Sequence, residues 1–233
     1  MWIKICGITR VEDARLAADA GADAVGVNMV AGPRRVGPAD ATQILSGIPP
    51  GVCPVVLARV SDDRLDPDAE QVIAACGVSW VQLYGDVTAS AIASQLESNR
   101  RPIVVVRVGD EHFAQSFDHL LRACGQHAPS AVLLDARHGG HLGGTGQPFP
   151  WHWVTQARRC GQLQNWPPIL LAGGLTSENV TEAVRIVQPW GVDVSSGVES
   201  APGRKDLARL AAFVRIARAA HRERSPLSPE GNG

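Results

Sequence analysis

Residues 102–108, PIVVVRV, and residues 131–136, AVLLDA, are short apolar runs that carry a charged side chain near their ends. A third run, VCPVVLA, spans residues 52–58. Runs without regular polar alternation are typical of strands in a parallel sheet that is covered on both faces. They alternate along the chain with longer helical patterns, which predicts repeated βα units.

This alternation predicts eight βα units. Eight units can form either an open doubly wound sheet or a closed barrel. The repeats are uniform and no G-x-G-x-x-G motif follows the first strand, so we expect an α/β fold of the (β/α)8 TIM-barrel type with eight parallel strands. The predicted strands are Trp2–Cys6, Ala24–Met29, Val52–Ala58, Trp80–Leu83, Ile103–Val108, Ala131–Leu134, Ile169–Ala172 and Gly191–Val194.

Capping residues predict where several helices begin. Thr9 with Glu12 forms a capping-box pattern, and Asp66 followed by Pro67 supplies an N-cap and a first-turn proline. Asp206 is expected to open the last helix. We expect a single barrel domain over residues 1–220 and a disordered tail over residues 221–233, where HRERSPLSPEGNG is polar and contains several prolines and glycines.

The composition is that of an ordinary globular chain, with 233 residues, 45% hydrophobic residues and a formal net charge of -1. It lacks the basic excess that nucleic acid or an anionic membrane selects, and no apolar stretch is long enough to span a bilayer. We therefore expect a small-molecule partner, no nucleic acid and no membrane. The sequence leaves a monomer and a homodimer equally open.

The cysteines give no sign of a disulfide framework or of a zinc site, because they are odd in number, widely spaced and without a C-x-x-C pair. A reducing compartment fits this pattern, and with no leader-like N-terminal segment we expect a cytoplasmic enzyme. The five cysteines are Cys6, Cys53, Cys76, Cys124 and Cys160.

Two reactive side chains are expected at the carboxyl ends of strands, where barrels place their chemistry. Cys6 ends the first predicted strand, and a thiol there needs only a modest downward shift of its pKa to act as a base. A buried cysteine is more often a small hydrophobic residue. Asp135 follows the sixth strand, where burial favours its protonated form, although a turn or N-cap role is equally common. Together they would form a base and an acid for an isomerisation.

An anion site is expected after the seventh and eighth strands. Glycines and serines there place backbone N–H groups where barrels commonly bind phosphate. Either loop alone could be a plain turn. The expected donors are Gly173, Gly174, Ser195, Ser196 and Gly197.

Arg34, in the loop after the second strand, is a candidate for binding a carboxylate, with Arg35 as its rival; a solvated loop arginine is the simpler reading. None of the seven histidines clusters with acidic residues at the strand ends in the pattern of a metal site. We therefore expect no metal and no cofactor.

Several motifs together resemble the phosphoribosylanthranilate isomerase family of tryptophan biosynthesis, over roughly residues 4–213. The resemblance is dense at both ends and weak between residues 38–79 and 86–131. The matching segments are KICGIT, EDA, GADAVG, VQLYGD, LLDA, GGTG, LAGGLTSENV, GVDVSSGVES and PGRKD.

The resemblance implies an Amadori rearrangement of N-(5-phosphoribosyl)anthranilate to 1-(2-carboxyphenylamino)-1-deoxyribulose 5-phosphate, without a cofactor. Asp135 would match the family's acid, which protonates the ring oxygen and opens the sugar to a Schiff base. Cys6 would match the base that takes the C2 proton, and Arg34 the arginine that holds the anthranilate carboxylate.

Four places depart from the family pattern, and one of them is Gly32, where the serine of S-P-R is expected. Asn28 stands in VNM where F-V-F is expected, Tyr84 replaces the histidine of V-Q-L-H-G, and Pro150 replaces the aspartate of F-D-W. They leave open an isomerase for another phosphoribosyl arylamine, or a silent barrel that only binds a phosphorylated metabolite. A histidine-pathway sugar isomerase of similar shape is disfavoured. In that family the first strand ends in aspartate, whereas here the first predicted strand ends in Cys6. The glycine-rich segment from Arg137 to Pro148 is expected to be a mobile loop over the mouth.

Overall fold

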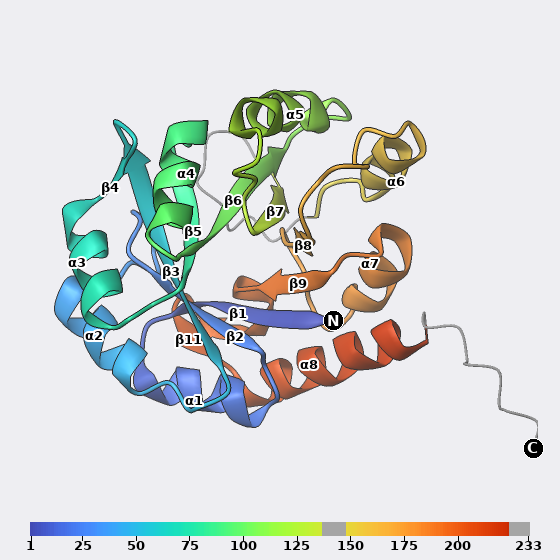
Figure 1. Ribbon diagram of the computed structural model, residues 1–233. Coiled ribbons are helices and arrows are strands. Elements are labelled where there is room, and N and C mark those ends of the chain that lie inside the picture. The colour runs from blue at the N-terminus through green and yellow to red at the C-terminus, as the bar shows by residue number, and fades with distance from the viewer. Residues whose placement is uncertain (137–147, 224–233) are drawn as a thin grey trace, which may run out of the picture.

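The computed structural model describes residues 1–136 and 148–223, and within them eight parallel strands close into a barrel (Figure 1). Around the barrel the order is β2-β1-β9-β8-β7-β6-β5-β3, and β2 also pairs with β3. The predicted TIM barrel is therefore confirmed. The barrel strands are β1 (Trp2–Ile8), β2 (Ala24–Asn28), β3 (Cys53–Ser61), β5 (Trp80–Gly85), β6 (Arg101–Val108), β7 (Ala131–Ala136), β8 (Ile169–Leu171) and β9 (Gly191–Val194).

Helices follow the strands and form the outer ring (Figure 1). Two short antiparallel hairpins are added at the carboxyl ends of strands: β4 (Arg64–Leu65) pairs with the end of β3, and β10 (Glu199–Ala201) pairs with β11 (Arg204–Lys205). The helices are α1 (Val11–Asp19), α2 (Pro38–Ser46), α3 (Pro67–Ala75), α4 (Ala89–Glu97), α5 (Phe113–Cys124), α6 (His152–Arg159), α7 (Val180–Val187), α8 (Leu207–Arg222) and the 3-10 turn η1 (Ser196–Val198).

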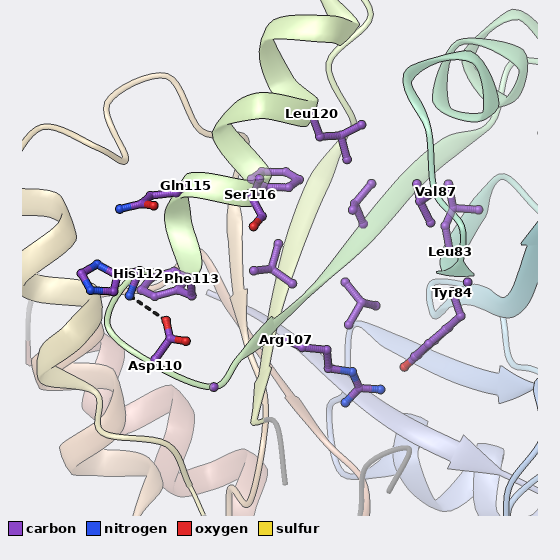
Figure 2. A pocket seen from close by; sticks show the side chains of 16 residues that line it. Leu83, Tyr84, Val87, Arg107, Asp110, His112, Phe113, Gln115, Ser116 and Leu120 are labelled. Atoms are coloured by element: carbon purple, nitrogen blue, oxygen red, sulfur yellow. Dashed lines mark hydrogen bonds between the residues drawn. The ribbon is translucent and has the colours of Figure 1, made fainter. Parts of the chain in front are cut away.

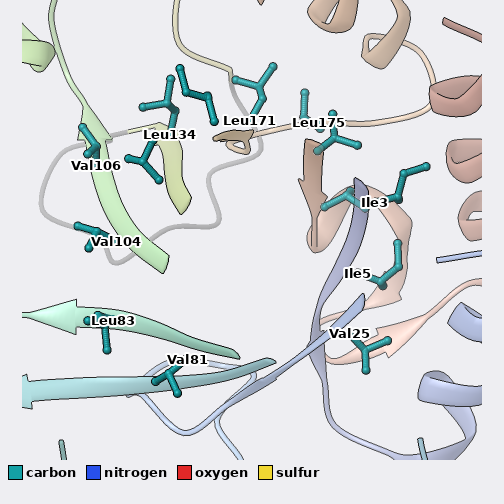
Figure 3. Close-up of a cluster of buried hydrophobic side chains, with 14 of the residues drawn as sticks. Ile3, Ile5, Val25, Val81, Leu83, Val104, Val106, Leu134, Leu171 and Leu175 are labelled. Atoms are coloured by element: carbon teal, nitrogen blue, oxygen red, sulfur yellow. The ribbon is translucent and has the colours of Figure 1, made fainter. Parts of the chain in front are cut away.

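The hydrophobic core has an outer and an inner layer, because alternate residues of each strand point to opposite faces. Ile3, Ile5 and Val25 point outward and pack under the helices, with Val81 and Leu134 doing the same on other strands (Figure 3). The larger cluster lies in this outer layer, which explains why the strands need no polar alternation.

The inner layer closes the amino-terminal end of the barrel with aromatic rings. Trp2 lies 5.5 Å from Trp80 and 5.2 Å from Trp190, measured between ring centroids. The guanidinium of Arg101 covers Trp80 at 5.5 Å. With this end filled, the opening of the barrel is at the carboxyl ends of the strands.

Two of the three predicted helix caps are confirmed. Asp66 accepts a hydrogen bond from the backbone of Asp68, and Asp206 accepts one from the backbone of Arg209. The predicted capping box at Thr9 is wrong. The hydroxyl of Thr9 donates instead to the carbonyl of Gly203 at 2.5 Å, because the β10–β11 hairpin folds against the first loop.

The last helix continues through Arg222, so the first two residues of the predicted tail belong to α8. Residues 224–233, where disorder was predicted, lie outside the described residues. Within the described part of the chain, no helix is long and apolar enough to cross a membrane.

Candidate active site

Cys6 lies two residues before the end of β1. The strand ends at Ile8 and not, as predicted, at Cys6. Its side chain belongs to the inner layer of the barrel and is 8% exposed. The register with β2 shifts between Cys6 and Ile8, and Gly7 has a φ of +73° there. A Cβ on Gly7 would lie 2.3 Å from Cδ of Arg34, so glycine is required beside the predicted base.

Two buried lysines surround Cys6, and they are the only lysines in the sequence. Lys4 is fully buried and its Nζ lies 2.8 Å from Oδ1 of Asp193. The Nζ of Lys205 donates to the carbonyl of Cys6 at 2.6 Å and to Oε1 of Glu199 at 2.8 Å. Each ammonium group thus contacts a carboxylate next to the cysteine.

The surroundings of Cys6 act on its thiol in opposite directions. Burial raises the pKa of the thiol, while the charges of Lys4 and Lys205 lower it, and the net effect is a raised pKa. For Lys4, burial lowers the pKa of the ammonium, but Asp193 and Cys6 more than offset this effect. Lys4 therefore stays charged beside the thiol.

Asp135 is the predicted acid and lies at the end of β7, as expected. Arg107, its register partner on β6, forms an ion pair with its Oδ2. Burial raises the pKa of the Asp135 carboxyl, partly against the charge of Arg107. A Cβ on Gly173 would lie 3.2 Å from Oδ1 of Asp135, so the acid also borders the predicted phosphate loop.

Tyr84 and Arg107 line the rim beside the acid, where Figure 2 shows their side chains reaching toward one another from β5 and β6. The guanidinium lies 5.7 Å from the centroid of the Tyr84 ring. The Tyr84 hydroxyl accepts a hydrogen bond from Nε2 of Gln82 at 2.8 Å. The pair borders a cavity of about 580 Å³ bounded by β5, β6 and α5.

The loops after β8 and β9 meet as predicted and enclose a second cavity of about 420 Å³. Its lining includes Gly174, Ser196 and Gly197. A Cβ on Gly197 would lie 1.9 Å from the carbonyl oxygen of Leu175, which explains why glycine joins the two loops. The hydroxyl of Ser195 is buried and has no hydrogen-bond partner among the described residues.

Arg34 reaches back over β1 from the loop after β2. Its Nε and Nη2 contact the two carboxylate oxygens of Glu199 at 2.8 and 2.6 Å. This bond raises the pKa of the Arg34 guanidinium. Burial raises the pKa of Glu199, but Arg34 and Lys205 outweigh it and the net pKa is lowered. Arg34 thus packs against Gly7, the residue after Cys6, whereas Arg35 is exposed.

Asn28, one of the residues that depart from the family pattern, has a structural task. Its Oδ1 accepts a hydrogen bond from the backbone of Val30 at 2.9 Å, and its own carbonyl accepts one from Val36. These bonds hold the loop that carries Arg34. The predicted mobile loop lies outside the described residues, except for Pro148.

Sequence reasoning missed four residues of this site. Arg107 ends an apolar strand, so the rule that selected Asp135 could have found it. Arg209 lines the second cavity and follows the PGRKD segment. The scarcity of lysine in the chain was a signal for Lys4 and Lys205.

Comparison with known proteins assigns the chain to a family. The model of the N-(5'-phosphoribosyl)anthranilate (PRA) isomerase family matches residues 3–216. The N-(5'-phosphoribosyl)anthranilate isomerase of Geobacter metallireducens is 42% identical over 93% of this chain and 98% of its own length. That of Acidithiobacillus ferrooxidans is 40% identical over 91% and 95%.

Solved structures agree with this assignment. The phosphoribosyl anthranilate isomerase of Thermotoga maritima matches with a TM-score of 0.79 and 30% identity, over 94% of this chain and 99% of that one. An isomerase in complex with reduced 1-(o-carboxyphenylamino)-1-deoxyribulose 5-phosphate matches with a TM-score of 0.77 and 29% identity, at the same coverage. This chain belongs to the N-(5'-phosphoribosyl)anthranilate isomerase family.

Proposed function

We propose that the chain catalyses the Amadori rearrangement of N-(5'-phosphoribosyl)anthranilate to 1-(o-carboxyphenylamino)-1-deoxyribulose 5-phosphate. The observation that carries this proposal is the arrangement of Cys6 and Asp135. They lie inside one barrel mouth, where both are influenced by Lys4 and Asp193, and the phosphate loops lie alongside. An acid, a base and an anion site are the parts that this isomerisation requires.

Asp135 acts first, as the general acid. Its proton goes to the furanose ring oxygen while the nitrogen lone pair forms a C1=N bond, and the C1–O bond breaks to give the open Schiff base. Burial at the end of β7 supports this role because it favours the protonated carboxyl.

Cys6 acts second, as the general base. Its thiolate takes the proton from C2 and gives an enolamine, which tautomerises to the ketone when C1 gains a proton. No atom is lost or gained overall, so no cofactor is required. Lys205 supports the thiolate because positive charge favours the ionised form.

The phosphate and the carboxylate of the substrate hold its two ends. The loops containing Gly173, Gly174, Ser195, Ser196 and Gly197 receive the phosphate. Arg34 receives the anthranilate carboxylate through the N–H groups that Glu199 does not use. Binding energy at both ends then fixes the sugar between acid and base.

The partner is thus a small phosphorylated molecule, and we place the enzyme in the cytoplasm as a monomer or a homodimer. The site lies within one chain, so either state supports activity. Sedimentation analysis of the purified protein distinguishes the two states.

The experiment that tests the function is turnover of freshly prepared N-(5'-phosphoribosyl)anthranilate, followed by fluorescence, with Cys6→Ala and Asp135→Asn as controls. Turnover by the wild type that is lost in both variants supports the proposal. A folded wild type without turnover contradicts it, and then Tyr84 and Arg107 on the rim direct the search to other phosphoribosyl arylamines.

A further inference from the structure

Lys4 is a buried charge that the mechanism above leaves without a defined task. It is fully buried inside the barrel, and its side chain and that of Cys6 come from the same face of β1. Burying an ammonium group is costly unless it is paired. A second lysine, Lys205, lies on the other side of Cys6, while every other cationic side chain of the 22 Lys and Arg residues is arginine.

The Lys4 ammonium and the sulfur of Cys6 both border the space beside Gly26. A Cβ on Gly26 would lie 3.0 Å from the sulfur of Cys6 and 3.1 Å from Nζ of Lys4. The positive charge of Lys4 also favours the ionised form of the Cys6 thiol. Any larger residue at position 26 would enter the space that they share.

Around Cys6, before the substrate binds, the paired cations outnumber the carboxylates by one. Lys4 pairs with Asp193, whereas Lys205 and Arg34 both pair with Glu199. Three cations therefore face two carboxylates. A thiolate at Cys6 supplies the missing negative charge and makes the buried group neutral.

We propose that Lys4 is a positioning residue for the base, which holds the sulfur of Cys6 above Gly26 and supplies the positive charge against which the thiolate forms. This inference rests on the proposed role of Cys6. In this role Lys4 neither contacts the substrate nor transfers a proton. Asp193 keeps Lys4 charged and in place. Gly26 leaves the space between the two groups open.

Other charged groups also face the sulfur, and the test must separate Lys4 from them. Asp193 on β9 raises the pKa of the thiol, and Lys205 on β11 lowers it, each less strongly than Lys4 acts. Arg34, in the loop after β2, and Tyr84, on β5, also interact electrostatically with Cys6. A double variant that removes both Lys4 and Asp193 must therefore still raise the pKa of Cys6.

The direct measurement is the thiolate absorbance of Cys6, titrated as the difference between the wild type and Cys6→Ser. It needs no substrate, so it is independent of whether the proposed function holds. In a Lys4→Met background we expect the titration to move at least one pH unit higher. Lys4→Met/Asp193→Asn, which leaves no unpaired buried carboxylate, should move it in the same direction, and Lys4→Arg should keep it near the wild-type value.

The kinetic measurement is the pH profile of kcat/KM. Loss of Lys4 should lower the plateau at least tenfold and move the alkaline limb upward, with KM little changed, because one pKa unit is a tenfold change in the ionised fraction. Gly26→Ala, which pushes the ammonium and the sulfur apart, should change the profile in the same direction. An unchanged Cys6 titration in both the double variant and Gly26→Ala overturns the proposal, even if activity is lost.

Discussion

The base side and the acid side of the mouth are built differently. On the base side, Lys4 and Lys205 are fully buried around Cys6 and each contacts a carboxylate. On the acid side, the side chains of Arg107 and Asp135 are 26% and 19% exposed. Water weakens an exposed ion pair more than a buried one. The charges of the base side are thus fixed by folding, while those of the acid side can respond to pH and to a bound substrate.

This difference defines the ionisation state in which the enzyme works. The ordinary pKa of a thiol lies several units above that of a carboxyl group. Burial raises the pKa of both Cys6 and Asp135. With the thiol holding the higher pKa, as it does for the free groups, the pair that carries one proton is mainly a thiol with a carboxylate. The proposed reactive form, a thiolate with a carboxylic acid, holds the same number of protons and is the minor form. The acid limb of the pH profile then belongs to Asp135 and the alkaline limb to Cys6.

The largest effect is expected when either side loses its reactive group. Cys6→Ala and Asp135→Asn should each lower kcat by about 10²- to 10⁴-fold, the range for loss of a general acid or base. KM should change little, because the phosphate loops remain. Steady-state kinetics on both variants measure this. A loss in one variant alone would remove the other residue from the mechanism.

The second-largest effect is expected at the loops after β8 and β9, which are proposed to bind the phosphate of the substrate. Gly197→Ala places a Cβ 1.9 Å from the carbonyl oxygen of Leu175, and neither backbone can yield. The loops should separate and KM should rise about 10- to 100-fold, which corresponds to one lost hydrogen bond to a charged group.

Gly37→Ala is the matched control for Gly197→Ala, since a Cβ on Gly37 meets nothing within 4 Å. Inhibition by inorganic phosphate should weaken in Gly197→Ala and not in Gly37→Ala. If kcat falls in Gly197→Ala while KM and the phosphate inhibition stay constant, the loops position the reacting groups and do not bind phosphate.

The fold followed from the sequence because every strand is a local apolar run between helix signals. The proposed reactive pair, Cys6 and Asp135, comes from the rule that places chemistry at strand ends, which requires no tertiary contact. The ion pair of Asp135 with Arg107 did not follow, because it depends on the register between β6 and β7.

The environment of Cys6 could not be predicted from the sequence either. Lys205 is separated from Cys6 by 199 positions, and the two meet only because β9 closes the barrel against β1. The error at Thr9 has the same cause, since its hydroxyl bonds to Gly203 from the far end of the chain. Local patterns identify which residues are unusual, and closure decides which of them meet.

A smaller effect is expected from Arg107, and it tests whether the acid side responds to charge. Arg107→Met removes the cation that favours the ionised carboxylate, so the pKa of Asp135 should rise. The acid limb of kcat/KM should then move to higher pH, and the plateau should increase by up to about tenfold for one pKa unit. Arg101→Met, at the opposite end of β6, is the control and should leave the acid limb in place. An acid limb that stays fixed in Arg107→Met would mean that Asp135 is not the group that titrates there.

The smallest effect is expected from an ion pair outside the site. The side chains of Arg185 and Glu223 are 60% and 58% exposed, and their contact of 2.6 Å is as short as that between Arg34 and Glu199. Arg185→Ala should cost less than about 1 kcal/mol, as is usual for exposed pairs, and lower Tm by no more than about 4 °C. The kinetic constants should not change, because a short contact matters for catalysis only where it acts on a reacting group. Arg185 lies on α7, which follows the loop of Gly173 and Gly174, so a raised KM in this variant would mean that α7 holds the phosphate loop in place from its far end.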